Sequence, residues 1–188
     1  MEHIEDIIEG CKSGKNEAQR ALYNLFQRKM YGVCLRYSSN YAEAEDTTQE
    51  GFVKVFRNIH QYKNKGPIGA WIRRIMINTA LEKHKKASLL YISDDMTEYE
   101  NEINYDDIIN NITAKDIIMI IQELSPQYKL VFNLYEIDGY SHAEIAEMLC
   151  ISESTSRSNL LRAKVILQQK ILKHFPYCRN INTRKNVR

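Results

Sequence analysis

Residues 141–167 decide the fold of the second half of the chain, and they read SHAEIAEMLCISESTSRSNLLRAKVIL. Ser141 and Glu144 have the spacing of a capping box, in which the serine hydroxyl and the glutamate side chain each accept a backbone N–H at a helix start. A helix is therefore predicted to begin directly after Ser141. It is short, because its apolar face spans only two turns: Ile145, Ala146, Met148 and Leu149.

A second helix is predicted a few residues further on. Cys150 and Ile151 follow the first helix, and Ser152 and Ser154 are both candidate caps for the next one. Beyond them, apolar residues keep the helical period at Leu160, Ala163, Leu167 and Ile171. Two helices joined by so tight a turn have the layout of a helix-turn-helix, which places its second helix in the DNA major groove.

The polar start of the second helix supplies candidate DNA contacts. Short hydroxyls, an amide and a guanidinium can donate to phosphates or read base edges, and an arginine can hold guanine through two parallel bonds. The candidates are Thr155, Ser156, Arg157, Ser158 and Asn159, followed by Arg162 and Lys164, which suit phosphates. The alternative is a surface helix whose hydroxyls only cap it and whose bases only face water, and the pattern alone leaves both open.

The composition of the whole chain also favours helices. Its 188 residues include seven Gly and three Pro, and residues of high helix propensity fill long periodic stretches. We therefore expect an all-α chain. No apolar run approaches the about 20 residues of a membrane span, and the N-terminus lacks the features of a secretory signal. These two features predict a cytoplasmic location.

Charge is segregated along the chain, although the formal net charge is only +2. Residues 63–86 hold seven bases and one acid, residues 93–111 hold seven acids and no base, and residues 161–188 hold eight bases and no acid. An acidic stretch therefore separates two basic helical blocks.

This segregation predicts the domain organisation. The expected segments are a helical unit over about 10–86, an acidic linker over 87–111, a helix-turn-helix unit over 112–175 and a basic tail over 176–188.

Two long helices are predicted in the first unit. The earlier one, Ala42–His60, begins with acids and carries an apolar stripe of Phe52, Val55, Phe56 and Ile59. A neighbouring, mostly polar face carries Asp46, Gln49, Glu50 and Val53 at i, i+3, i+4 and i+7. That face can receive a basic partner surface or can simply face water.

The later helix is predicted over Trp71–Lys86, after a turn at Gly66-Pro67. Its inner side holds Ile72, Ile75, Met76 and Thr79. An aromatic ring, an amide and cations share a stripe on the opposite side, Trp71, Arg74, Asn78 and Lys85, with Arg73, Lys83 and Lys86 close by. Such a surface can stack an unpaired base and neutralise phosphates. A tryptophan that only anchors the helix in the core fits the pattern as well.

The sequence contains no recognisable catalytic or metal-binding motif. Cys11, Cys34, Cys150 and Cys178 are scattered, without the spacing of a zinc site or a disulfide framework. No phosphate-cradling glycine loop occurs, nor a nucleophile beside an evident acid and base. We expect neither a cofactor nor a metal, and a binding protein rather than an enzyme. A dimeric repressor or activator and a resolvase-like recombinase are the rival interpretations.

Three ordered stretches resemble the extracytoplasmic-function sigma factors of the sigma-70 family. AEDTTQEGFVKVF at 44–56 resembles the family element A-E-D-x-x-Q-E-x-F-x-x-x-[WF], and WIRRIMINTA at 71–80 is similar to W-[LI]-x-R-I-x-x-N-x-A. Residues 124–164 look like the C-terminal sigma helix-turn-helix, except that Cys150 and Ser156 stand where the family commonly has Gly and Val. The resemblance covers about 150 of the 188 residues.

The resemblance implies a bacterial transcription initiation factor that binds core RNA polymerase, directs it to specific promoters and assists promoter melting. It implies two small helical domains, sigma region 2 and sigma region 4, joined by the acidic linker. Its implied partners are core polymerase through the β′ clamp helices and the β subunit, promoter DNA and an anti-sigma factor, without insertion into a membrane.

The resemblance also implies roles for matched residues. The helix that docks on the clamp helices would use Asp46, Gln49, Glu50, Val53 and Phe56. Contacts to the minus-10 element would come from Lys63, Asn64, Lys65, Trp71, Arg74, Asn78, Lys83 and Lys85. Contacts to the minus-35 element would come from Thr155, Ser156, Arg157, Ser158, Asn159, Arg162 and Lys164.

Overall fold

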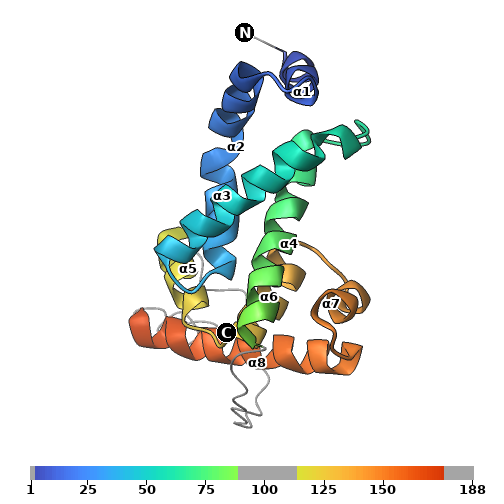
Figure 1. The fold of residues 1–188 in the computed structure, drawn as a ribbon. Helices are drawn as coiled ribbons and strands as arrows, with labels where there is room; N and C mark the ends of the chain where they lie inside the picture. Colours follow the sequence, from blue (N-terminus) through green and yellow to red (C-terminus); the bar gives the residue numbers. More distant parts are fainter. Residues whose placement is uncertain (1–2, 89–113, 176–188) are drawn as a thin grey trace, which may run out of the picture. The chain divides into compact units, whose positions relative to one another are not determined.

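The computed structural model describes residues 3–88 and 114–175, and every regular element within these ranges is a helix (Figure 1). The all-α prediction is therefore confirmed. The chain divides into two compact units, Met1–Tyr91 and Ile92–Arg188. Apart from its first two residues, the predicted acidic linker lies outside the described residues, and so does the predicted basic tail.

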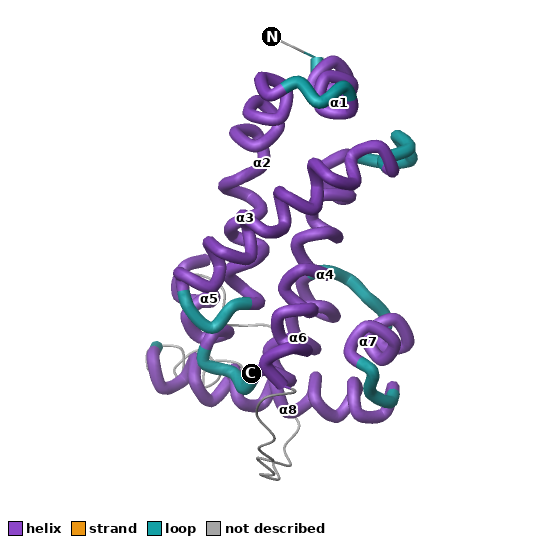
Figure 2. Tube along the Cα trace, viewed as in Figure 1, coloured by secondary structure: helices purple, strands orange, loops and turns teal. Residues whose placement is uncertain are grey.

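Within residues 3–88, the first unit contains four α-helices, drawn as purple tubes in Figure 2: α1 (Ile4–Lys12), α2 (Asn16–Tyr37), α3 (Tyr41–Asn58) and α4 (Ile68–Ser88). A 3₁₀ turn, η1 (Ile59–Gln61), continues α3. Helices α2, α3 and α4 pack against one another, and α1 packs on α2. These three mutual contacts build the core of the unit.

The core of the first unit is formed by the predicted apolar stripes. Phe52, Val55 and Ile59 are buried, and the inner side of α4 buries Ile72, Met76 and Thr79 in the same way. The remaining stripe members, Phe56 and Ile75, are half-buried at the edge of the core. The helical period was therefore sufficient to identify which faces turn inward.

Helix α1 was not predicted, and it begins before the expected start of the unit at about residue 10. Its apolar residues Ile7, Ile8 and Cys11 are buried. A Cβ atom added at Gly10 would lie 2.6 Å from the Ala18 side chain, so the contact of α1 with α2 is close. A nine-residue helix is marginal on its own, and this packing stabilises it.

Helix α4 begins three residues earlier than predicted. The carbonyl of Pro67 accepts from the amides of Ala70 and Trp71, so the helix starts directly after the proline. Ile68 is buried at this start, and Gly69 lies against the Phe26 ring. This packing explains why the helix begins before Trp71, its predicted first residue.

The second unit consists of α5 (Ala114–Gln122), α6 (Pro126–Phe132), the π-helix η2 (Asn133–Ile137), α7 (His142–Leu149) and α8 (Glu153–His174). Helix α8 packs against α5, α6 and α7. One cluster of its core joins α5 and the α5–α6 turn to α8 and contains Ile120, Ile121, Leu124, Ala163 and Leu167.

The predicted helix-turn-helix is present as α7 and α8. The Glu144 amide donates to Ser141 Oγ at 3.3 Å, and the Ser141 amide donates to the Glu144 carboxylate at 2.8 Å, which completes the capping box. The second cap is Ser152, whose hydroxyl accepts from the Thr155 amide at 3.0 Å. Between the helices, Cys150 adopts a left-handed conformation with φ of 56°.

The close approach of α3 to α4 gives a prediction of stability. A Cβ atom at Gly51 would lie 2.2 Å from Met76 Sδ, whereas a Cβ atom at Gly32 of α2 meets nothing within 4 Å. We expect Gly51→Ala to lower the free energy of unfolding by about 1–2 kcal/mol, because overpacking against the fully buried Met76 outweighs the about 1 kcal/mol that alanine gains in a helix. Gly32→Ala should raise it by up to about 1 kcal/mol, since alanine favours a helix.

Urea unfolding followed by far-ultraviolet circular dichroism measures both changes. Equal or greater stability of the Gly51→Ala protein would contradict the tight α3–α4 contact.

Candidate protein-binding and nucleic-acid surfaces

Helix α3 presents most of its predicted protein-binding residues on one outward face. Asp46, Gln49 and Val53 are exposed, with 46% of Val53 accessible to solvent, and Glu50 lies half-buried beside them. Phe56 is half-buried with its ring centroid 6.1 Å from that of Phe52, so it belongs to the margin of the core. The structure therefore brings four of the five residues together on a surface that a partner can reach.

A network of ion pairs joins α3 to α4 at Glu50. Its carboxylate lies 3.3 Å from Lys54 Nζ and 3.5 Å from Lys83 Nζ, and Lys54 Nζ also contacts Glu82 at 2.7 Å. Partial burial alone would raise the pKa of Glu50, but the hydrogen bonds and charges of the two lysines outweigh it and lower the pKa. Lys83, predicted as a DNA contact, is therefore held against α3. Sequence spacing within one helix could not reveal this pairing.

The outer side of α4 keeps the other predicted polar residues at the surface. Arg74, Asn78 and Lys85 are exposed. Trp71 is half-buried, and its ring centroid lies 5.6 Å from that of the buried Tyr62. Of the two roles considered for Trp71, this packing supports the anchor.

The loop before α4 is held in a defined conformation. The Tyr62 hydroxyl donates to the Gly66 carbonyl, Asn64 has φ of 54°, and Gly66 has φ of 153°. Lys63, Asn64 and Lys65 are exposed between these fixed points. Because Tyr62 also packs on Trp71, the loop is fastened to the start of α4.

The residues predicted at the start of α8 divide between its two sides. Thr155, Arg157 and Ser158 are exposed. By contrast, Ser156 is 0% exposed and Asn159 is 6% exposed, so direct DNA contact by either would require the unit to open.

Ser156 joins the two helices of the helix-turn-helix. Its Oγ forms a 2.9 Å hydrogen bond with Nδ1 of His142, and the His142 ring stacks on Tyr135 with centroids 4.4 Å apart. A buried hydroxyl requires such a partner. The sequence showed only that Ser156 stands where the family commonly has valine. It did not identify His142 as the partner of Ser156.

Two of the predicted DNA-contacting cations on α8 have carboxylate partners. Arg157 pairs with Glu153 at 2.8 Å one turn earlier, on the exposed side of the helix. Lys164 pairs with Glu136 of η2 at 2.6 Å, and both side chains are about one-third exposed or less. Arg162 is half-buried on the same helix. Exposed pairs such as the first are weak in water, so a phosphate or a base can compete for Arg157.

Two further features concern membranes and metals. Within residues 3–88 and 114–175, no helix combines the length and the apolar character needed to cross a bilayer. In the same ranges, no three His, Cys, Asp or Glu side chains are grouped so that they could hold a metal ion.

Comparisons with known proteins agree with this architecture. The family model for sigma-70 region 2 matches residues 22–89, and the model for sigma-70 region 4 matches residues 114–167. The ECF RNA polymerase sigma-E factor of Haemophilus influenzae is 25% identical over 177 residues, which cover 88% of this chain and 93% of that relative. The ECF sigma factor SigW of Bacillus subtilis is 25% identical over 180 residues, covering 89% and 96%.

A solved structure shares the fold. The sigma factor RpoE of Bartonella quintana, crystallised with the anti-sigma factor NepR, superposes with a TM-score of 0.51 at 17% identity and covers 80% of this chain and 94% of its own.

Two helical units, one of which carries a helix-turn-helix, together with the matches to sigma-70 regions 2 and 4, place the chain among the helical transcription factors. The two region models together match well over half of the chain, and the chain belongs to the sigma-70 family, in its extracytoplasmic-function group. Sigma factors of this group bind RNA polymerase and direct promoter-specific transcription initiation. That part of the predicted function is confirmed.

The His142 contact gives a prediction of pH dependence. Burial lowers the pKa of His142, and the nearby cations Arg157 and Lys164 lower it further against the opposing effect of Glu153. Below the ordinary histidine pKa of about 6.5, the unfolded chain therefore binds more protons than the folded chain at this site. Stability of the second unit should fall as the pH decreases from 7.5 to 5.5.

The protection factor of the Ile145 amide, which donates to the Ser141 carbonyl at 2.9 Å, measures the effect, because it removes the intrinsic pH dependence of exchange. His142→Gln should reduce the acid sensitivity of this exchange. An imidazole pKa at or above 6.5 in a nuclear magnetic resonance titration would contradict the assignment.

Proposed function

We propose that the first unit is the polymerase- and minus-10-binding domain and that the second unit is the minus-35-binding domain. The proposed segments are region 2 over about 10–86, the linker over 87–111 and region 4 over 112–175. The observation that carries the proposal is the outward face of α3. It presents the family-matched Asp46, Gln49 and Val53 to solvent in a helix whose other faces are packed.

The polymerase surface is this face of α3. Asp46 and Gln49 offer a carboxylate and an amide, and Val53 adds an exposed apolar contact beside them. Such a mixture of polar groups around one apolar residue suits a transient protein interface. The β′ clamp helices of core polymerase are the proposed partner of this face.

The minus-10 surface consists of the loop at 63–65 and the outer side of α4. A base that has left the stack can be held beside the loop while Arg74, Asn78 and Lys85 contact the strand. Holding the base must offset a few kcal/mol of unstacking, which is how the domain would assist promoter melting. Trp71 supports this surface by packing its ring against the Tyr62 ring.

The minus-35 surface is the exposed start of α8. Arg157 is the proposed reader of a base edge, and Thr155, Ser158 and Arg162 are placed to contact the backbone or neighbouring bases. Ser156 and His142 act behind this surface by fixing α8 to α7.

The remaining features follow from this function. We infer that the chain itself catalyses no reaction, because nucleotide addition belongs to the polymerase, and that it works in the cytoplasm, where its DNA lies. The Bartonella quintana relative was solved with an anti-sigma factor, and we propose a partner of that kind here.

Separate substitutions should distinguish the two surfaces of the first unit. Asp46→Ala and Gln49→Ala each remove a polar contact to polymerase, so we expect each to weaken binding of purified core polymerase by about tenfold, or about 1.4 kcal/mol. Arg74→Ala and Asn78→Ala should leave that affinity unchanged and reduce promoter opening. Lys83 is unsuitable for this test because it pairs with Glu50.

Fluorescence anisotropy measures polymerase binding, and permanganate footprinting measures opening. Equal losses of both properties in all four proteins would contradict two separate surfaces. Sequence-specific retardation of promoter DNA by the chain without polymerase would instead support a dimeric repressor or activator.

Substitutions at Arg157 test the minus-35 surface. Arg157→Ala should weaken use of a promoter by about 1–3 kcal/mol if Arg157 holds a guanine, and Arg157→Lys should recover little because lysine lacks the planar fork. In vitro transcription from a responsive promoter with its natural upstream element and with that element scrambled provides the readout. If Arg157→Ala lowers both templates equally, Arg157 contacts only the backbone.

A further inference from the structure

A cluster of three side chains joins α7, α8 and η2 behind the exposed start of α8. Nδ1 of His142 in α7 forms a 2.9 Å hydrogen bond with Oγ of Ser156 in α8, and the His142 ring stacks on Tyr135 of η2 with centroids 4.4 Å apart. Ser156 is buried, His142 is half-buried and Tyr135 is exposed. The cluster therefore runs from the buried junction of the helix-turn-helix to its surface.

Both protonation states of His142 fit this cluster. A neutral ring can accept from the Ser156 hydroxyl, and a charged ring, which carries N–H on both nitrogens, can donate to the same oxygen. The face of the Tyr135 ring also attracts a cation. His142 can therefore gain a charge while the contact between α7 and α8 is kept.

The charged groups around the His142 ring come from α7 and from the two elements packed against it, α8 and η2. From α8, Glu153 and Arg157 act on the ring with opposite signs, and Lys164 adds a second positive charge. Lys164 is itself paired with Glu136 of η2 at 2.6 Å. The carboxylate of Glu144 in α7 is already engaged in the capping box.

Arg157 is the member of this set whose surroundings change when DNA binds. In the free chain, burial and then the charge of Arg157 lower the pKa of His142, and Glu153 opposes them. Arg157 pairs with the Glu153 carboxylate at 2.8 Å on the exposed side of α8, and such a pair separates at little cost. An Arg157 that turns to DNA is neutralised there and leaves the Glu153 carboxylate without its partner. Both changes favour a proton on His142.

We propose that His142 takes up a proton when the second unit binds the minus-35 element, so that recognition of this element strengthens as the pH falls. The inference rests on the proposed function and adds a coupled exchange to it. Arg157 moves from Glu153 to DNA, and the proton on His142 compensates the charge of Glu153.

The sign of the pH dependence follows from linkage. A group whose pKa is higher in the complex than in the free chain tightens binding as the pH decreases between the two values, by at most about tenfold per pH unit for one site. The free value lies below the ordinary histidine pKa of about 6.5, so the informative range is pH 7.5 to 5.5. Protons at His142 therefore oppose folding of the second unit but favour its binding to DNA.

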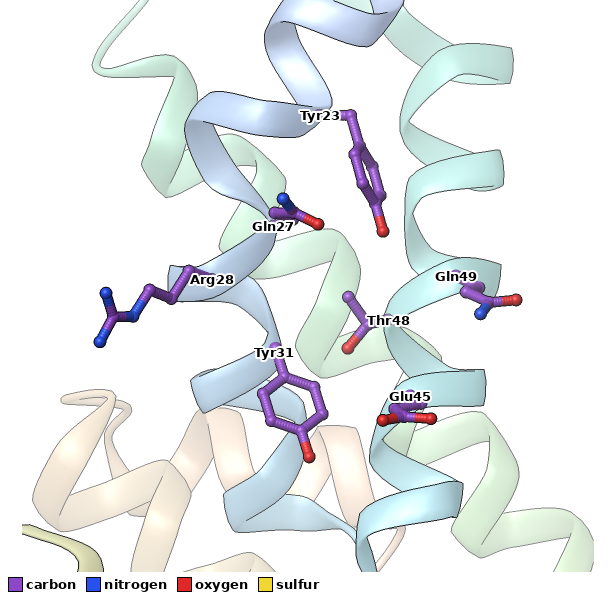
Figure 3. A pocket seen from close by; sticks show the side chains of 7 residues that line it. All are labelled: Tyr23, Gln27, Arg28, Tyr31, Glu45, Thr48 and Gln49. Carbon is purple, nitrogen blue, oxygen red and sulfur yellow. The ribbon is translucent and has the colours of Figure 1, made fainter.

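The first unit holds a cluster of a different kind. A cavity of about 430 Å³ between α2 and α3 has no histidine among its lining residues. Figure 3 shows Tyr31 of α2 and Glu45 of α3 at this cavity. Burial raises the pKa of Tyr31, and the charge of Glu45 raises it further, so this hydroxyl stays neutral from pH 5.5 to 7.5. In contrast to His142, Tyr31 adds no pH response in that range.

Promoter binding by the full-length chain assembled with purified core polymerase tests the inference. Affinities are measured at pH 7.5 and 5.5 for a responsive promoter with its natural upstream element and with that element scrambled. The ratio of the two affinities cancels effects of pH that do not involve this element. We expect the ratio to rise by about threefold to tenfold as the pH falls.

Two substitutions should reduce this rise. His142→Gln keeps a neutral hydrogen-bonding group beside Ser156 and should remove most of it. Glu153→Gln should reduce it, because no carboxylate then loses its partner when Arg157 turns to DNA. Glu153 is exposed, so this variant provides the test if His142→Gln is unstable.

His174→Gln is the matched control. His174 lies on the same helix about five turns, or roughly 27 Å, beyond Ser156, and it contacts Glu123 at 3.3 Å. This separation is well above the Debye length of about 8 Å at physiological salt. The control should show the same rise as the unaltered chain.

Isothermal titration calorimetry counts the proton directly. Binding enthalpies measured at pH 6.5 in two buffers of different ionisation enthalpy give the number of protons that the complex takes up. We expect the assembly with His142→Gln to take up about half a proton fewer than the assembly with the unaltered chain. Equal numbers would contradict the proposal.

Three outcomes of the affinity measurements would overturn the inference. A ratio that stays constant or decreases as the pH falls would exclude proton uptake on binding. An undiminished rise in both His142→Gln and Glu153→Gln, or an equal reduction in His174→Gln, would exclude His142 as its source. A ratio close to one at every pH would mean that the upstream element is not read, and the proposed function of the second unit would then fail itself. Circular dichroism at each pH establishes that the helices are intact.

Discussion

The contact between α3 and α4 is the constraint on which the first unit depends. Gly51 permits the two helices to approach until Met76 fills the space that a side chain would need. Glu50, Lys54, Glu82 and Lys83 then bridge the same helices with ion pairs at their edge. The polar face of α3 and the basic face of α4 consequently belong to one packed pair of helices, so a partner on each is held in a fixed relation to the other.

The sequence was sufficient for features that depend on local chemistry. Ser141 and Glu144 cap α7 because both groups lie within one turn, and the stripes through Val55 and Ile72 face the core because helical periodicity is local. Contacts between helices depend on distance in space. The pairing of Lys83 with Glu50 was for that reason invisible, and so was the packing that forms α1.

The helix-turn-helix shows how an unusual sequence retains the expected geometry. Cys150 takes the left-handed conformation that glycine adopts more readily, at some conformational cost. Ser156 places a hydroxyl where the family commonly has an apolar residue, and His142 satisfies that hydroxyl at 2.9 Å. Both departures lie at the junction of α7 and α8. Residue type alone predicted a DNA contact for Ser156, because the sequence does not show on which side of the junction its hydroxyl lies.

The distribution of ion pairs also bears on how strongly the chain binds DNA. Arg157, Lys164 and Lys83 each have a carboxylate partner within 4 Å, and a phosphate must displace or share that partner. The exposed Arg157 pair costs little to separate, since such pairs contribute about 0–1 kcal/mol. The less exposed pairs of Lys164 and Lys83 join neighbouring elements, so their separation also weakens helix packing. Arg157 is therefore the cation of α8 that we propose as the base reader, while Lys164 joins α8 to η2 in the second unit and Lys83 joins α4 to α3 in the first.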